Sequence, residues 1–253
     1  MLQDRNIIIQ ELNIKYYQNE KFSRIQPVIF LHGWSSRAMI FGKIFEKCEN
    51  ILAIDLPGFG GSEVPKSAWS LSDYAFFINE FFEKIKIENP IIVGHSFGGS
   101  IGIKYCSKYS NVKKLILIGS AGIRKKTAKK YFFLIFSKIL GVLWHLPIIR
   151  NSKGAVRKFF YKLVDSEDYI NAGILMDTYK KIISEDLKED LRKIHTPAIL
   201  IWGKNDLDTP IQYAKLMHGL LKNSRLYTIP NAGHYVFLDN EAEFEHIFLA
   251  NIK

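Results

Sequence analysis

Short runs of β-branched and aliphatic residues alternate along this chain with longer segments whose apolar residues recur every three or four positions. The runs predict buried strands and the longer segments predict amphipathic helices, an alternation typical of a mostly parallel sheet with helices on both faces. We expect about eight strands, the first two antiparallel, at residues 7–9, 14–17, 28–31, 51–54, 91–93, 115–118, 198–202 and 226–229. Crossover helices are expected at residues 74–85, 101–109, 213–221 and 241–249.

The alternation stops between residues 123 and 190, where strand-like runs give way to aromatic-rich segments of helical period. This break predicts a helical cap inserted after the sixth strand. The expected division is a core domain of residues 1–122 and 191–253 and a cap of residues 123–190. No internal repeat and no Gly/Ser-rich linker occurs, so we expect the cap to pack on the core.

The 253 residues, 47% of them hydrophobic, can bury the core of one catalytic domain. No apolar run approaches the roughly 20 residues of a membrane span. Asp4 and Glu11 flank a short apolar run at the N-terminus, unlike a secretory signal, so a cytoplasmic location is expected. Cys48 and Cys106 lack the number and spacing of a disulfide scaffold or metal site, and no metal is expected.

The formal net charge is +10, but the lysines are spread along the chain and match no nucleic-acid-binding module. We therefore expect no nucleic-acid partner. The exception is the segment RKKTAKK at residues 124–130, which precedes the apolar residues 131–149. Two interpretations stay open: this segment roofs an apolar pocket as part of the cap, or it also rests on an anionic membrane surface as an interfacial helix.

The sequence GHSFGG, with Ser96 at its centre, directly follows a predicted strand and directly precedes a predicted helix. A G-x-S-x-G in this setting predicts a nucleophile elbow, in which a tight turn presents a serine above the sheet. The serine then lies at a helix N-terminus, where backbone N–H groups favour developing negative charge. Ser96 is the predicted nucleophile.

A nucleophilic serine needs a base and an acid that orients the base. His234 lies between the last predicted strand and the last predicted helix, and we expect it to be the base. Asp206 and Asp208 both follow the seventh predicted strand. We expect Asp206 to be the acid, because it lies three residues after Gly203, and Asp208 to be a cap or turn residue before the helix that opens at Pro210.

An oxyanion hole requires two donors. The backbone N–H groups of Phe97, which follows the nucleophile, and of Trp34, which follows the third strand, are expected to supply them. His32 abuts the same turn and is expected to satisfy backbone groups rather than to catalyse. The run DLPGFGGS, residues 55–62, lacks the full G-x-G-x-x-G of a nucleotide loop and is expected to be a structural turn.

Five motifs occur in this order along the chain: HGW, DLPGFGGS, VGHSFGG, IWGKNDLDTP and NAGHYVFLD. Together they resemble the α/β-hydrolase family, in its branch of cap-bearing esterases and carbon–carbon bond hydrolases. The resemblance covers the chain from about residue 28 to its end, and only the cap lacks a motif. Ser96 excludes the branches that use an aspartate nucleophile. Relatives that cleave ring-fission products typically have a longer glycine-proline run after HG and a tryptophan after the catalytic histidine. Ser35, Ser36 and Tyr235 stand at these places, which weakens that assignment.

The expected function is therefore hydrolysis of a small-molecule carboxylic ester or thioester with an apolar acyl chain or aromatic group, through an acyl-enzyme on Ser96 and without a cofactor. Carbon–carbon hydrolysis of a dienoate diketone uses the same triad and stays open. A ligand-binding protein that kept this fold without turnover is the alternative of another class.

Overall fold

An eight-stranded sheet forms the centre of the computed structural model, which describes residues 2–124 and 172–252. The strands lie in the order β1-β2-β4-β3-β5-β6-β7-β8. β1 and β2 are antiparallel to each other, β2 is antiparallel to β4, and every other pair is parallel. The strands are β1 Leu2–Ile9, β2 Leu12–Asn19, β3 Val28–Leu31, β4 Ile51–Ile54, β5 Ile91–His95, β6 Lys114–Ile118, β7 Ala198–Gly203 and β8 Ser224–Ile229. This is the α/β-hydrolase sheet that the sequence predicted.

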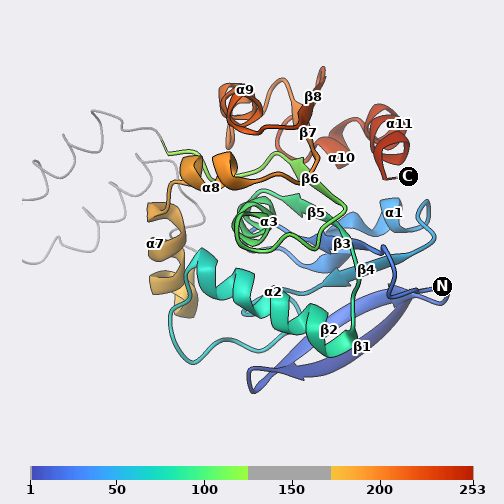
Figure 1. Ribbon diagram of the computed structural model, residues 1–253, viewed down its shortest axis with the longest axis vertical. Coiled ribbons are helices and arrows are strands. Elements are labelled where there is room, and N and C mark those ends of the chain that lie inside the picture. Colours follow the sequence, from blue (N-terminus) through green and yellow to red (C-terminus); the bar gives the residue numbers. More distant parts are fainter. Residues whose placement is uncertain (1, 125–171, 253) are drawn as a thin grey trace, which may run out of the picture.

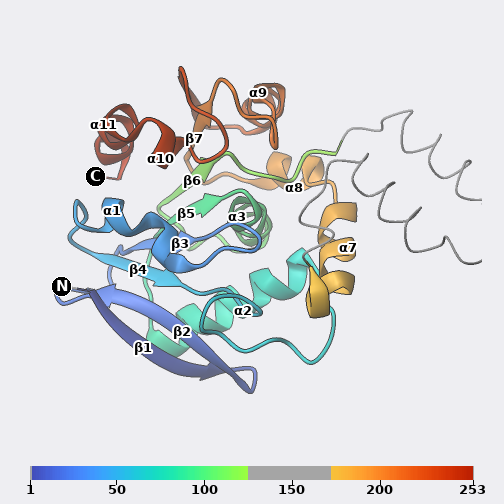
Figure 2. The ribbon, with the colours of Figure 1, turned by 180° about the vertical axis from the view of Figure 1, so that it is seen from behind.

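Helices cover both faces of the sheet, with α2 and α3 on one face and α1 and α11 on the other (Figures 1 and 2). The helices of the described residues are η1 Ala38–Phe41, α1 Gly42–Phe45, α2 Leu71–Ile85, α3 Phe97–Lys108, η3 Gly173–Leu175, α7 Met176–Ser184, α8 Lys188–Lys193, α9 Ile211–Leu220, α10 Val236–Asp239 and α11 Glu241–Asn251. None of these helices is long and apolar enough to cross a membrane.

The four predicted helices are confirmed, but α2 begins three residues earlier than periodicity indicated because of its cap. The Ser70 side chain accepts from the Asp73 N–H, and the Asp73 carboxylate accepts from the Ser70 N–H at 2.7 Å. This reciprocal pair satisfies two donors that a helix start leaves unpaired. The short helices α1 and α10 were not predicted, because a single turn of four residues shows no helical period.

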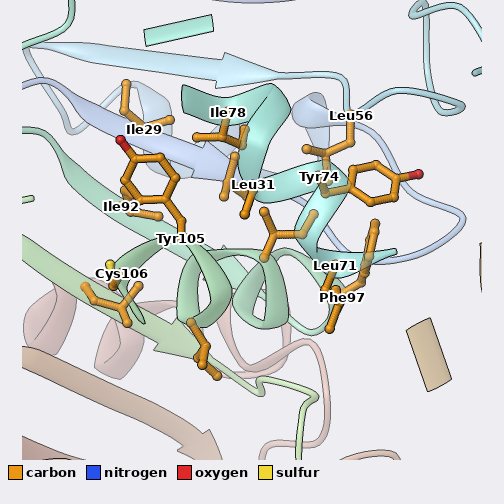
Figure 3. Close-up of a cluster of buried hydrophobic side chains, with 14 of the residues drawn as sticks. Ile29, Leu31, Leu56, Leu71, Tyr74, Ile78, Ile92, Phe97, Tyr105 and Cys106 are labelled. Carbon is orange, nitrogen blue, oxygen red and sulfur yellow. The ribbon is translucent and has the colours of Figure 1, made fainter. Parts of the chain in front are cut away.

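The apolar core has two layers, one on each side of the sheet. In the layer shown in Figure 3, Leu71, Tyr74 and Ile78 of α2 belong to the same cluster as Phe97 and Tyr105 of α3. The Tyr74 hydroxyl donates to the carbonyl of Pro57 at 3.0 Å, so this buried polar group is satisfied. The two cysteines are free and buried, as core thiols.

The chain that returns at residue 172 is tied to the core by long-range polar bonds. The Trp69 N–H donates to the Thr178 hydroxyl of α7 at 3.0 Å. Lys104 of α3 lies 2.9 Å from Asp190, and α8 packs against α3 and α9. The expected boundary between cap and core, after residue 190, falls inside α8, because this helix spans Lys188–Lys193.

Candidate active site

Ser96 lies at the junction of β5 and α3, as the cap residue of that helix. Its backbone has φ 50° and ψ −112°, a conformation that is strained for any residue with a side chain. Its N–H donates to the carbonyl of Ile118 in β6, and its carbonyl accepts from the N–H groups of Gly99, Ser100 and Ala121. These bonds hold the strained turn in place at the carboxyl edge of the sheet.

Two glycines of the GHSFGG sequence let strand, turn and helix approach one another. A Cβ atom on Gly98 would lie 2.1 Å from the Leu31 carbonyl oxygen, and one on Gly94 would lie 2.5 Å from the Gly98 carbonyl oxygen. Both neighbours are backbone atoms and cannot rotate away. The tight approach predicted for a nucleophile elbow is therefore present around Ser96.

His234 and Asp206, which are 28 residues apart in the chain, form a side-chain pair. His234 lies in the loop between β8 and α10, and its Nδ1 is 3.0 Å from Oδ2 of Asp206. The Asp206 side chain is fully buried, and the His234 side chain is 11% exposed. Burial alone raises the pKa of Asp206, but the hydrogen bond and charge of His234, together with the Thr209 bonds, lower it below its ordinary value.

The turn after β7 fixes the Asp206 carboxylate from the other side. Its Oδ1 accepts from the N–H groups of Asp208 at 3.0 Å and Thr209 at 2.8 Å, and the Thr209 hydroxyl lies 2.8 Å from Oδ2. Asp208 was expected to be a cap or turn residue, and it is the second: Pro210 is the cap residue of α9 with no side-chain cap, while the Asp208 N–H belongs to the turn after β7. Asp206 stabilises this turn itself, because its Oδ1 accepts from the N–H groups two and three residues further along the chain.

His95, beside the nucleophile, was not predicted to have a role. Its Nε2 lies 3.0 Å from the His234 carbonyl oxygen, and its ring centroid lies 4.7 Å from that of His234. Burial lowers the pKa of His95 to about 3, so the ring is neutral at neutral pH. A neutral His95 donates this bond and anchors the loop of His234. His95 at the end of β5 and the loop after β8 come together only in the folded chain, so no local sequence pattern indicates the hydrogen bond between His95 and the His234 carbonyl.

Trp34 and Phe97, the expected oxyanion donors, lie together at the carboxyl edge of β3 and β5. Their rings pack edge to face with centroids 5.4 Å apart. Within the described part of the chain, neither backbone N–H donates to a protein acceptor. The two donors are thus open to an external acceptor, as an oxyanion hole requires.

His32 and the turn at residues 55–62 support this edge. The His32 Nδ1 lies 2.7 Å from the Gly33 carbonyl oxygen, and its Nε2 accepts from the Leu56 N–H at 3.0 Å. Asp55 accepts from the N–H groups of Ala38 and Gly61. His32 and the turn therefore have the structural roles that the sequence predicted.

A cavity of about 660 Å³ opens at this edge. Ser96, His234, Trp34 and Phe97 all line it, while Asp206 lies behind His234 and out of the cavity wall. Its remaining wall combines apolar and aromatic side chains with polar ones, two of them charged, and consists of Gly33, His95, Ser100, Ala121, Ile123, Arg124, Tyr179, Ile182, Ile183, Leu207, Asp208, Thr209, Tyr213 and Tyr235. The predicted site residues thus converge, and the cavity is large enough for a small organic substrate.

Much of the predicted cap, including residues 131–149, lies outside the described residues, so its two interpretations stay predictions. The part that returns does reach the cavity, because Tyr179, Ile182 and Ile183 of α7 line it.

Asp206, Asp208 and His234 also place one possible metal-ligand atom each within 4.8 Å of one another. Two of these residues, Asp206 and His234, already face each other at hydrogen-bond distance. The cluster nevertheless calls for a chelator control in any activity measurement.

Comparison with known proteins agrees with this geometry. A model of the alpha/beta hydrolase family matches residues 28–247. The chain is 28% identical over 255 residues to the uncharacterized hydrolase YugF of Bacillus subtilis, covering 92% of this chain and 91% of YugF. It is 26% identical over 266 residues to a monoacylglycerol lipase, abhd6-B, of Xenopus laevis, covering 90% of this chain and 78% of the lipase.

Among solved structures, an esterase from Exiguobacterium antarcticum superimposes on the chain with a TM-score of 0.73 at 25% sequence identity, covering 99% of each chain. The family match covers most of the sequence, and the sheet order and the sequence motifs agree with it. This chain belongs to the alpha/beta hydrolase family.

Proposed function

We propose that this chain is a serine hydrolase that cleaves a carboxylic ester or thioester with an apolar acyl chain or an aromatic group. One observation supports this most: Ser96, strained at φ 50°, lines the same cavity as His234, whose Nδ1 faces the buried carboxylate of Asp206 at 3.0 Å. A serine, an imidazole and an acid in this relation form the parts of acyl-transfer catalysis.

In the proposed reaction, the Ser96 hydroxyl attacks the carbonyl carbon and His234 takes its proton at Nε2. Asp206 accepts the Nδ1–H bond, which keeps Nε2 free as a base and stabilises the imidazolium that forms. His234 then returns the proton to the departing alcohol or thiol, leaving an acyl-enzyme. Water attacks this intermediate by the same steps and releases the acid.

The backbone N–H groups of Trp34 and Phe97 are the proposed donors to the tetrahedral oxyanion. Each donor of this type contributes roughly 10²- to 10³-fold to kcat in other enzymes. Ser96 also lies at the N-terminus of α3, a helix of 12 residues, whose dipole favours the same negative charge.

The apolar part of the cavity wall supports the proposed substrate class. Ile123 follows β6, and Tyr179 and Ile182 come from α7, so two distant segments supply the apolar surface. We keep residues 123–190 as the proposed cap, and both its first two residues and α7 contribute to the cavity wall. The esterase and monoacylglycerol lipase names of the similar proteins also favour ester hydrolysis.

Covalent labelling tests the nucleophile. A fluorophosphonate probe should label the wild-type chain at one site, and Ser96→Ala should abolish the labelling, because only an activated serine reacts. Ser110→Ala is the matched control, since this exposed serine lies just beyond the end of α3 and outside the cavity wall, and it should leave labelling unchanged. Labelling that persists in Ser96→Ala would contradict the assignment.

A substrate panel tests the reaction class. 4-Nitrophenyl esters of increasing acyl length, acyl thioesters and a dienoate diketone should be compared on wild type and Ser96→Ala, with EDTA present in a parallel series. We expect turnover of esters or thioesters that EDTA leaves unchanged. Turnover of the diketone alone would favour carbon–carbon hydrolysis, and loss in EDTA restored by a divalent cation would favour a metal at Asp206, Asp208 and His234.

A further inference from the structure

We propose that Arg124 binds an acidic group of the substrate, so that the preferred ester or thioester carries a carboxylate or phosphate in addition to its scissile bond. This inference rests on the proposed function and names its substrate class. Arg124 follows β6 by six residues and lines the cavity that Ser96 and His234 also line.

Within the described residues, the Arg124 guanidinium donates hydrogen bonds only to backbone carbonyl oxygens. Its Nε donates to the Glu185 carbonyl and its Nη2 to the Ile182 carbonyl, both at 3.2 Å, at the C-terminal end of α7. A guanidinium has five N–H donors, so these two bonds leave three, including both on Nη1, without a described protein acceptor.

The neighbouring carboxylates are held by other cations. Glu185 lies 3.4 Å from Lys104, and Asp186 lies 2.8 Å from Lys188. Among the described residues, no carboxylate oxygen lies within 4.0 Å of a guanidinium nitrogen of Arg124. Within the described residues Arg124 therefore has no ion-pair partner at the cavity wall, although Asp186 and Glu185 lie near enough for their charges to act against the effect of burial on its pKa.

A charge in this position is costly unless it is paired. Burial lowers the pKa of Arg124, because removing a guanidinium from water disfavours its charged form. An oxyanion of a ligand would supply the missing counter-charge through two parallel, charge-assisted hydrogen bonds, for which a guanidinium is suited. The net charge of +10 would also favour the approach of an anionic substrate.

One other charged side chain, Asp208, lines the cavity. Asp208 is exposed and belongs to the turn that follows β7, whereas Arg124 is partly buried and joins β6 to α7. Water therefore screens Asp208 more than Arg124, and we expect the buried cation to dominate selectivity.

The test compares matched esters that differ only in charge. On the acyl side the pair is 4-nitrophenyl hexanoate and the 4-nitrophenyl monoester of adipic acid. On the alcohol side the pair is phenyl hexanoate and the hexanoate ester of 4-hydroxybenzoic acid. We expect the wild-type chain to favour the charged member of at least one pair in kcat/KM by roughly 10- to 100-fold, the range of a hydrogen bond to a charged group.

Arg124→Met should abolish this preference, because it should lower kcat/KM for the charged ester far more than for its neutral partner. Arg124→Lys should retain part of it, because a lysine keeps the charge but not the planar fork. Arg192→Met is the control: this arginine is on the exposed side of α8, pairs with Glu189 and should leave the preference unchanged. Free adipate or 4-hydroxybenzoate, matching the preferred pair, should slow fluorophosphonate labelling of wild type but not of Arg124→Met.

Each of the following outcomes overturns the inference. If the wild-type chain hydrolyses neutral esters and shows no charge preference in either pair, Arg124 does not select the substrate, although the proposed function stands. If the preference survives in Arg124→Met, another group binds the acid. If Arg124→Met lowers the thermal midpoint and lowers the rates for the charged and the neutral ester equally, Arg124 has only a structural role between β6 and α7. If Arg124→Met does not fold, an unchanged charge preference in Arg124→Lys contradicts the inference. If no ester is hydrolysed and Ser96 is not labelled, the proposed function itself fails.

Discussion

Asp206 and Asp208 are two residues apart, and their surroundings separate their roles at the residue scale. Asp206 is buried and faces His234, whereas Asp208 is exposed and contributes its N–H to the same turn. An asparagine at position 206 keeps an oxygen for the turn but faces the imidazole with an N–H donor, which forces the His234 tautomer that cannot act as a base.

Asp206→Asn is expected to lower kcat by about 10⁴-fold, the loss seen when this tautomer is enforced in other triads, while Asp208→Asn costs less than about tenfold. Steady-state hydrolysis of a 4-nitrophenyl ester measures both, and the thermal midpoint checks that both variants remain folded. Equal losses would mean that the carboxylates share the role, and a larger loss in Asp208→Asn would reverse the assignment.

At the scale of elements, the contact between the β5–α3 junction and β3 requires glycine at position 98. A methyl group there would meet the carbonyl groups of Leu31 and His32, so α3 would have to move away from the sheet. We expect Gly98→Ala to lower the free energy of unfolding by about 1–3 kcal/mol or more, as for other overpacked sites, and to reduce fluorophosphonate labelling of Ser96.

Gly219→Ala is the matched control for this prediction. Gly219 is exposed in α9, and a Cβ atom added there would meet nothing within 4 Å. The substitution should raise the free energy of unfolding by about 0.5–1 kcal/mol, because alanine loses less backbone entropy in a helix than glycine does. Urea unfolding followed by circular dichroism measures both variants, and similar effects at the two positions would refute the steric explanation.

At the scale of the whole molecule, two buried histidines make stability depend on pH. Burial lowers the pKa of His32 from 6.5 to about 4 and that of His95 from 6.5 to about 3. Between pH 6.5 and pH 4 the unfolded chain therefore binds protons that the folded chain excludes. Stability falls as the pH falls through this window, with a limiting slope of about 2.7 kcal/mol per pH unit for the two groups together.

Urea unfolding at intervals from pH 7 to pH 4 measures this slope. His95→Gln should reduce it by about 1.4 kcal/mol per pH unit, the contribution of one proton. His246→Gln, which removes an exposed imidazole of α11, is the control and should leave the slope unchanged. The lowered pKa of Asp206 acts below 3.8 and therefore outside this window. A slope that is the same in wild type and His95→Gln would show that His95 titrates in the folded protein.

The sequence by itself determined the longer elements of the core and their type, because helical and strand periods depend on neighbouring side chains. Residues 28–31 and 51–54 were predicted with the bounds that β3 and β4 have. Ser96 was identified as the candidate nucleophile because a G-x-S-x-G motif between a predicted strand and a predicted helix is a local sequence signal. Predicted strand and helix ends differed from the observed ends by up to five residues, at the start of β1, where ladder bonds to β2 extend the strand to residue 2.

Only the tertiary structure decided which distant groups meet. The sequence had already predicted that Asp206 orients His234, but not the bond from His95 to the His234 carbonyl, which spans 139 residues, or the bond from Trp69 to Thr178, which spans 109. In the sequence, Arg124 is only the first residue of the basic segment RKKTAKK. Its position in the cavity wall depends on where the chain leaves β6 and on its contact with α7. Such contacts depend on the order of strands in the sheet, which no local period encodes.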